Sequence, residues 1–108
     1  PVLEETGGFD HNFNLSDRKM RKPVNRIYVE HEKSGRSMEI LTTEPGVQFY
    51  SGNYLNQMKD QGFDSFDALC LETQMYPDSL NQKRFPSIIL SPGELYRQKT
   101  IHRFFIKK

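Results

Sequence analysis

The chain has 108 residues, 35% of them hydrophobic, and its 15 basic and 14 acidic residues leave a formal net charge of +1. Grooves that bind nucleic acid carry clustered basic residues, so this even balance argues against a nucleic-acid partner. The apolar runs fall short of the roughly 20 residues that span a bilayer, which argues against a membrane partner. The lone Cys70 allows no disulfide within the chain and favours a reducing, cytoplasmic compartment.

Alternating apolar and polar residues predict short β-strands along the chain. Residues 24–31 (VNRIYVEH) and 38–43 (MEILTT) flank a glycine-containing turn and predict a β-hairpin. Further strands are predicted at 47–50, 68–75, 87–90 and 100–106, with a surface loop at 56–66. Gly and Pro residues separate these segments, and none of them predicts a helix of useful length. We therefore expect an all-β fold of antiparallel strands, a sandwich or a barrel.

Polar side chains gather on one face of two predicted strands. Alternation in 68–75 places Glu72 and Gln74 on one face with Cys70, opposite an apolar face. In 47–50 the same rule places Gln48 and Tyr50 together. A carboxylate beside carboxamides would suit a polar ligand. The pattern also fits residues that simply face solvent on a one-sided sheet, and alone it favours this plainer interpretation.

The stretch GGFDHNF at residues 7–13 brings Asp10 and His11 together between aromatic residues. An Asp–His pair can orient a base, but neighbours along a strand point to opposite faces. The pattern therefore favours a turn-capping Asp10 and a packed or exposed His11, and it places His31 and His102 at the surface. No His, Cys or acidic residues show the spacing of metal ligands, so we expect no metal site.

Four longer motifs resemble the C-terminal part of the aldose 1-epimerase, or galactose mutarotase, family. They are GGFDHNF (7–13), SGRSMEILTTEPGVQFYSGNYL (34–55), CLETQMYPDSLNQKRFPS (70–87) and ILSPGELY (89–96). The resemblance implies a mutarotase-like β-supersandwich of antiparallel strands, with an open sugar-binding cleft over a large curved sheet. Residues 1–108 would then be the C-terminal portion of a single such domain.

The resemblance also implies an activity and the residues that perform it. The family interconverts the α and β anomers of hexoses such as galactose and glucose. By resemblance, Glu72 of LETQ would be the catalytic general base, while Asp10 of GFDHN and Gln48 of PGVQFY would bind the sugar substrate. The reaction involves neither redox chemistry nor group transfer, so it needs no cofactor.

The acid of the family is a histidine that precedes the portion matched here, and nothing in this sequence matches it. We therefore expect a fragment that is inactive alone and whose partner is the N-terminal remainder of the same fold. The alternative is a non-catalytic carbohydrate-binding protein that keeps the cleft without turnover. Action on phosphorylated hexoses would need clustered arginines, and Arg36, Arg84 and Arg97 are dispersed along the sequence.

Overall fold

The structure, a computed structural model, describes residues 2–107. Its elements in chain order are helix α1 (Val2–Thr6), β1 (Asp10–Asn14), β2 (Val24–His31), β3 (Arg36–Thr42), β4 (Gly46–Tyr50), the 3-10 helix η1 (Leu55–Gln61), β5 (Cys70–Gln74) and β6 (Thr100–Ile106). Within these residues the strands form two antiparallel three-stranded sheets, in the orders β1-β4-β5 and β2-β3-β6. The predicted all-β fold is confirmed, and its two sheets are consistent with the sandwich that the resemblance implies.

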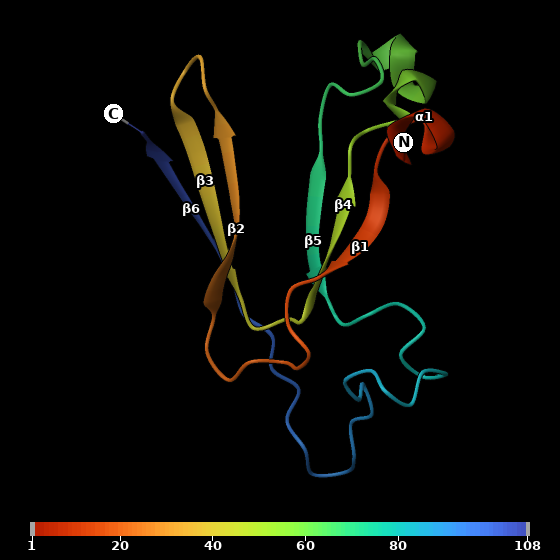
Figure 1. Cartoon of the computed structure of the whole chain (residues 1–108), viewed down its shortest axis with the longest axis vertical. Helices are drawn as coiled ribbons and strands as arrows, with labels where there is room; N and C mark the ends of the chain where they lie inside the picture. The colour runs from red at the N-terminus through yellow and green to blue at the C-terminus, as the bar shows by residue number, and fades with distance from the viewer. Residues whose placement is uncertain (1, 108) are drawn as a thin grey trace.

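The two sheets meet at one end and diverge toward the other (Figure 1). Residues 43–45 carry the chain from β3, the central strand of one sheet, into β4, the central strand of the other. The long segment between β5 and β6 passes below this junction as irregular backbone. The link at 43–45 therefore joins the two strands, β3 and β4, that each have a neighbouring strand on both sides.

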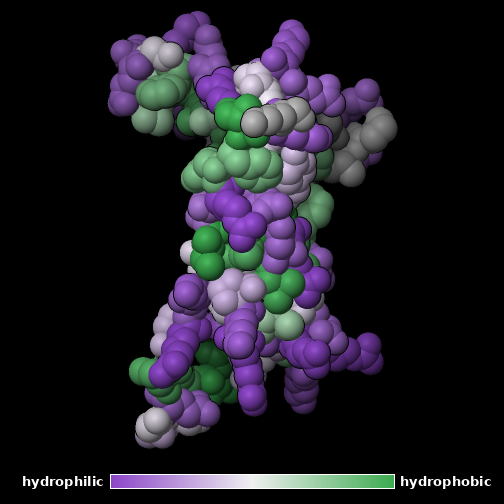
Figure 2. All heavy atoms as spheres, turned by 90° about the vertical axis from the view of Figure 1, so that its left-hand side faces the viewer, coloured by the Kyte–Doolittle hydropathy of each residue, from purple (hydrophilic) through white to green (hydrophobic). Residues whose placement is uncertain are grey.

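Burial is concentrated at this junction. Residues 42–47 form an unbroken buried run, and Ile40 and Val47 on either side of the link are 0% and 4% exposed. Tyr76 packs nearby at 8% exposure, and its ring contacts Phe85 edge-on with centroids 5.1 Å apart. Elsewhere many large apolar side chains are exposed, and on the face shown in Figure 2 they are scattered among polar ones. The junction is therefore the part of the molecule that holds the two sheets together.

The predicted hairpin is confirmed, since β2 and β3 pair antiparallel around a turn in which the backbone N–H of Gly35 donates to the carbonyl of His31 at 2.9 Å. Gly35 has a φ of +68°, and a Cβ there would lie 2.7 Å from the carbonyl oxygen of Lys107. Both the left-handed backbone and the close approach of a neighbouring chain segment therefore require glycine at this turn.

The prediction of a strand at 87–90 is wrong. Residues 87–90 form no strand, and Ile88, Ile89 and Leu90 are 42%, 73% and 55% exposed. Within the described residues no strand runs beside this segment, so its backbone has no ladder to join despite its apolar composition. Residues 56–66 lie at the surface as predicted, but they also contain most of η1. This short polar 3-10 helix lacks the apolar periodicity by which helices are recognised.

Candidate functional site

The candidate site lies on one face of the sheet formed by β1, β4 and β5. Residues opposite each other in antiparallel strands point to the same face, as do residues two apart along one strand. The register places Gln48 opposite Asn12 of β1 on one side and opposite Glu72 of β5 on the other. The same pairing brings to this face Asp10, Asn14, Tyr50, Cys70 and Gln74. We call this the polar face.

The predicted faces of β4 and β5 agree with this arrangement, because Gln48 and Tyr50 meet Glu72 and Gln74 on a single surface. The opposite face carries the apolar set, including Val47. The sequence predicted each pair separately. Their meeting depends on β4 and β5 being hydrogen-bonded neighbours, which alternation within one strand does not reveal.

Asp10 joins the polar face through β1. The carboxamide Nε2 of Gln48 donates a hydrogen bond of 2.8 Å to Asp10 Oδ1, which links the central strand to its neighbour. The interpretation of Asp10 as a turn cap is therefore wrong, since the residue begins a five-residue strand and its side chain contacts another strand. The sequence misled here because two glycines precede the strand and suggest a turn.

A hollow of about 470 Å³ opens on the polar face. Its lining consists of Asp10, Gln48, Tyr50, Tyr54, Glu72, Gln74 and Pro77. The volume lies within the range of about 300–1,000 Å³ that is usual for small-molecule sites. The three residues singled out by resemblance, Asp10, Gln48 and Glu72, thus share one solvent-open depression with hydroxyl and amide groups around them.

Tyr54 and Pro77 are lining residues that the sequence did not predict. Both lie outside the strands, so no alternation could place them on a face. Tyr54 is 60% exposed, and its backbone N–H donates to the hydroxyl of Tyr50 at 3.0 Å. This contact holds the loop after β4 beside the hollow.

A second set of amides continues the polar face away from Asp10. Gln74 Nε2 donates to Asn12 Oδ1 at 3.0 Å, and Asn12 Nδ2 donates to Asn14 Oδ1 at 3.0 Å. Gly46 lies opposite both Asn14 and Gln74, and a Cβ on it would be 2.8 Å from Asn12 Oδ1. The absence of a side chain at Gly46 therefore makes room for the Asn12 amide.

No Asp–His dyad forms. His11 points to the face opposite Asp10, where its ring meets Phe9 edge-on with centroids 6.0 Å apart. His31 and His102 are exposed on the other sheet, as the sequence predicted. Across residues 2–107, no group of three or more His, Cys, Asp or Glu side chains could hold a metal ion. In the same range no helix is long and apolar enough to cross a membrane.

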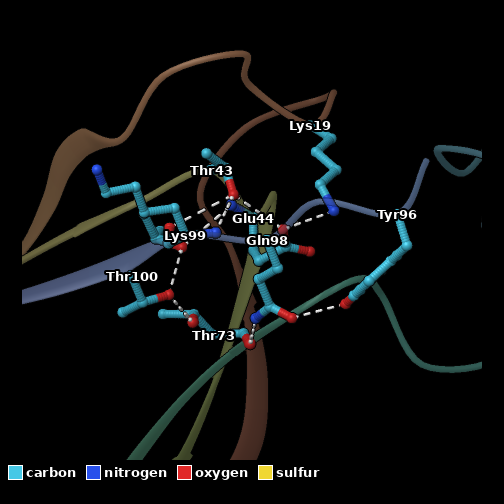
Figure 3. A network of polar contacts seen from close by, with 9 residues as sticks. Lys19, Thr43, Glu44, Thr73, Tyr96, Gln98, Lys99 and Thr100 are labelled. Atoms are coloured by element: carbon cyan, nitrogen blue, oxygen red, sulfur yellow. Dashed lines mark hydrogen bonds and ion pairs between the residues drawn. The ribbon is translucent and has the colours of Figure 1, made fainter.

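The link into β4 is fixed by a buried polar network (Figure 3). Glu44 has a side chain only 1% exposed, and its Oε1 lies 2.9 Å from Lys19 Nζ. The hydroxyl of Thr43 donates to the same oxygen at 3.1 Å, and Lys19 Nζ also sits 4.8 Å from the centre of the Tyr96 ring. A buried carboxylate needs such partners, so the network fixes the start of the strand that presents Gln48.

The candidate site is thus a solvent-open polar hollow on one sheet of an all-β scaffold, and comparison with known proteins identifies the family. The aldose 1-epimerase family model matches residues 1–103. The chain is 47% identical to galactose mutarotase of Mus musculus and 44% identical to galactose mutarotase of Homo sapiens, in each case over 92% of this chain and 30% of the relative. It is 34% identical to aldose 1-epimerase of Escherichia coli (strain K12), over 90% of this chain and 29% of that protein. The chain belongs to the aldose 1-epimerase family, as the resemblance predicted, and it spans about 30% of the length of these relatives.

Proposed function

We propose that this chain carries the base-bearing part of an aldose 1-epimerase that interconverts the α and β anomers of hexoses such as galactose and glucose. The observation that supports this most is the position of Glu72 in the hollow, beside the hydrogen-bonded pair Gln48 and Asp10. A carboxylate that can accept a proton there faces two groups suited to sugar hydroxyls.

The proposed reaction moves protons and opens one bond. Glu72 accepts the proton of the C1 hydroxyl, while an acid delivers a proton to the ring oxygen as the bond between C1 and that oxygen breaks. C1 becomes an aldehyde, the C1–C2 bond rotates, and the reverse steps close the ring in the opposite configuration. A positioned proton-transfer group typically contributes about 10²–10⁴ in rate. Asp10 and Gln48 would hold the sugar hydroxyls during the rotation.

The acid in this proposal comes from elsewhere in the fold. The residues lining the described hollow include no histidine, and His11 faces away from it. Because the chain spans about 30% of its relatives, we propose that it is the C-terminal portion of a single mutarotase-like domain and that the N-terminal remainder supplies the acid.

Polarimetry on freshly dissolved α-galactose tests this proposal. In the complete protein, Glu72→Gln should slow mutarotation at least about 100-fold because the base is lost. Glu39→Gln is the matched control, since Glu39 lies in the other sheet, where it contacts Arg103; it should leave the rate unchanged. The 108-residue chain alone should give only the buffer rate. A fully active Glu72→Gln variant would show that Glu72 is not the base.

A non-catalytic sugar-binding protein is the second candidate, since the hydrogen-bonded pair Gln48 and Asp10 could hold sugar hydroxyls in the hollow without any proton transfer. Calorimetric titration with galactose separates the two functions. An epimerase binds galactose and accelerates its mutarotation. A binding protein binds galactose, but mutarotation proceeds at the same rate as in buffer. Glu72→Gln should weaken binding only modestly in either case, because an amide still hydrogen-bonds to hydroxyls.

A further inference from the structure

Strand β5, which presents Glu72, lies at the edge of its sheet within the described residues. On one side its backbone pairs with β4. It is also held at Thr73, the residue next to Glu72, by two hydrogen bonds, one with Thr100 at the start of β6 and one from Gln98 just before that strand. The hydroxyl oxygens of Thr73 and Thr100 are 2.7 Å apart, and Gln98 Nε2 donates to the Thr73 carbonyl oxygen at 3.1 Å (Figure 3).

Thr100 itself belongs to the other sheet. It pairs with Thr42 of β3, and their hydroxyl oxygens lie 3.2 Å apart. Thr42 is fully buried, and its hydroxyl oxygen also accepts the backbone N–H of Glu44 at 3.1 Å. The Thr100 hydroxyl in β6 is therefore hydrogen-bonded to Thr42 of β3 and to Thr73 of β5. It connects the edge strand β5 to the buried junction.

Gln98 is fixed in turn. The hydroxyl of Tyr96 donates to Gln98 Oε1 at 2.7 Å, and Lys19 Nζ lies over the Tyr96 ring. Lys19 pairs with Glu44 at the junction. The Thr73 side chain and the Thr73 carbonyl are thus both connected, through chains of contacts, to Glu44 in the segment that leads into β4.

We propose that Thr100 and Gln98 are positioning residues for Glu72; this rests on the proposed function of Glu72 as the base. Because successive side chains of a strand point to opposite faces, a rotation of β5 about its own axis moves Thr73 and Glu72 together. Two attachments on the Thr73 side prevent that rotation. A displacement of about 1 Å in a reacting group can lower a rate about 100-fold, so the attachment matters more for the rate than for binding.

Thr100→Val in the complete protein removes the hydroxyl and keeps the shape of the side chain. We expect kcat for mutarotation to fall about tenfold while KM stays within about twofold. Thr100→Ser restores the hydroxyl and should recover most of kcat. Gln98→Leu changes an exposed side chain and should lower kcat in the same way, which keeps the test available if Thr100→Val does not fold.

Ser37→Ala is the matched control, since Ser37 is a buried hydroxyl of the same sheet whose contacts do not reach β5. It should lower the thermal midpoint without changing kcat. A double-mutant cycle gives the sharper test: in a Glu72→Gln background, Thr100→Val should leave the residual rate unchanged, because it acts through the Glu72 carboxylate.

The outcomes separate the two proposals. If Glu72→Gln remains fully active, the assignment of the base fails and the positioning role fails with it. If Glu72→Gln is inactive while Thr100→Val and Gln98→Leu keep the normal kcat, only the positioning role is overturned. An equal loss from Thr100→Val with and without Glu72 would also overturn it, since that result indicates a general structural effect.

Discussion

Gln48 Nε2 lies 2.8 Å from Asp10 Oδ1 and donates a hydrogen bond to it, while the Gln48 backbone is paired directly with Glu72. A neutral carboxamide therefore separates two carboxylates on the polar face. Its amide group satisfies one of them, and its lack of charge avoids repulsion with the other. This relationship makes the residue at position 48 sensitive to charge more than to size.

Gln48→Glu places a third carboxylate between Asp10 and Glu72. Like charges on neighbouring strands repel, so the cluster would take up protons more readily as the pH falls. We expect the acid limb of the kcat/KM profile for galactose to move up by about one pH unit. Polarimetric rates between pH 4 and 9 would measure the shift.

Gln82→Glu is the control for this prediction. Gln82 Nε2 donates to the Asp78 carboxylate at 2.7 Å, and that bond is the main reason why the pKa of Asp78 is lowered from 3.8. The same charge change therefore occurs beside a carboxylate that is not among the residues lining the hollow. The pH profile of Gln82→Glu should match that of the unmodified protein. An unmoved pH profile for Gln48→Glu would contradict the prediction.

The ion pair between Lys19 and Glu44 should dominate the stability of the junction. Lys19→Met leaves the nearly inaccessible Glu44 carboxylate without its cation, and breaking such a pair costs about 3 kcal/mol of unfolding free energy. Glu44→Gln should cost less, because no buried charge remains. Urea unfolding of the complete protein, compared at equal m-value, measures both. Equal losses for the two variants would show that the charge is not the cause.

Gly46→Ala should disturb the polar face by a steric clash and not by backbone strain. The new Cβ would meet Asn12 Oδ1 at 2.8 Å and Tyr76 Cδ1 at 3.1 Å. We expect a loss of about 1–2 kcal/mol in unfolding free energy and a higher KM for galactose, because the Asn12 amide must turn away from Gln74.

Gly93→Ala is the contrasting variant. A Cβ at Gly93 would meet no atom within 4 Å, but the residue has a φ of +87°, which strains any other side chain. It should lower stability without changing KM. A normal KM for Gly46→Ala would mean that Asn12 does not contribute to the proposed sugar site.

The sequence predicted those parts of the fold that local alternation controls. The bounds of β2 and β6 are the predicted ones, and the faces of Glu72 and Gln48 follow from counting by two along each strand. The 87–90 segment failed because an apolar run becomes a strand only where another strand lies alongside it, and the pattern contains no information about such neighbours.

Contacts between distant segments could not be predicted from alternation. Thr73 and Thr100 are 27 residues apart and belong to different sheets, yet their hydroxyls are hydrogen-bonded. Asp10 lies on the polar face because β1 pairs with β4, and this pairing could not be inferred from alternation within either strand. Asp10 was singled out by its family motif. Tyr54 and Pro77 also lie within matched motifs, but they were given no role there, and alternation could not place them because they lie outside the strands.

The pair formed by Glu30 and Lys107 makes stability depend on pH. Lys107 Nζ lies 2.9 Å from Glu30 Oε2, and the hydrogen bond from Lys107, followed by that from Tyr28, lowers the pKa of Glu30 from 4.5. The same hydrogen bond raises the pKa of Lys107 from 10.5. The carboxylate therefore adds stability above pH 4.5 that is lost as the pH falls through its folded pKa, and the ammonium adds stability below pH 10.5 that is lost as the pH rises through its folded pKa.

Lys107→Met should consequently differ from the unmodified protein most between pH 5 and 10 and converge with it at more acidic and more alkaline pH. An NMR titration of the Glu30 carboxyl carbon should show its pKa returning toward 4.5 in this variant. Arg103→Met, which removes the separate surface pair with Glu39, should leave the Glu30 titration unchanged. Because the side chain of Lys107 is 57% exposed and that of Glu30 is 21% exposed, solvent ions reach the pair. Added salt should therefore shrink the difference between Lys107→Met and the unmodified protein, and a salt-independent difference would point to lost packing of the lysine stem instead of lost charge.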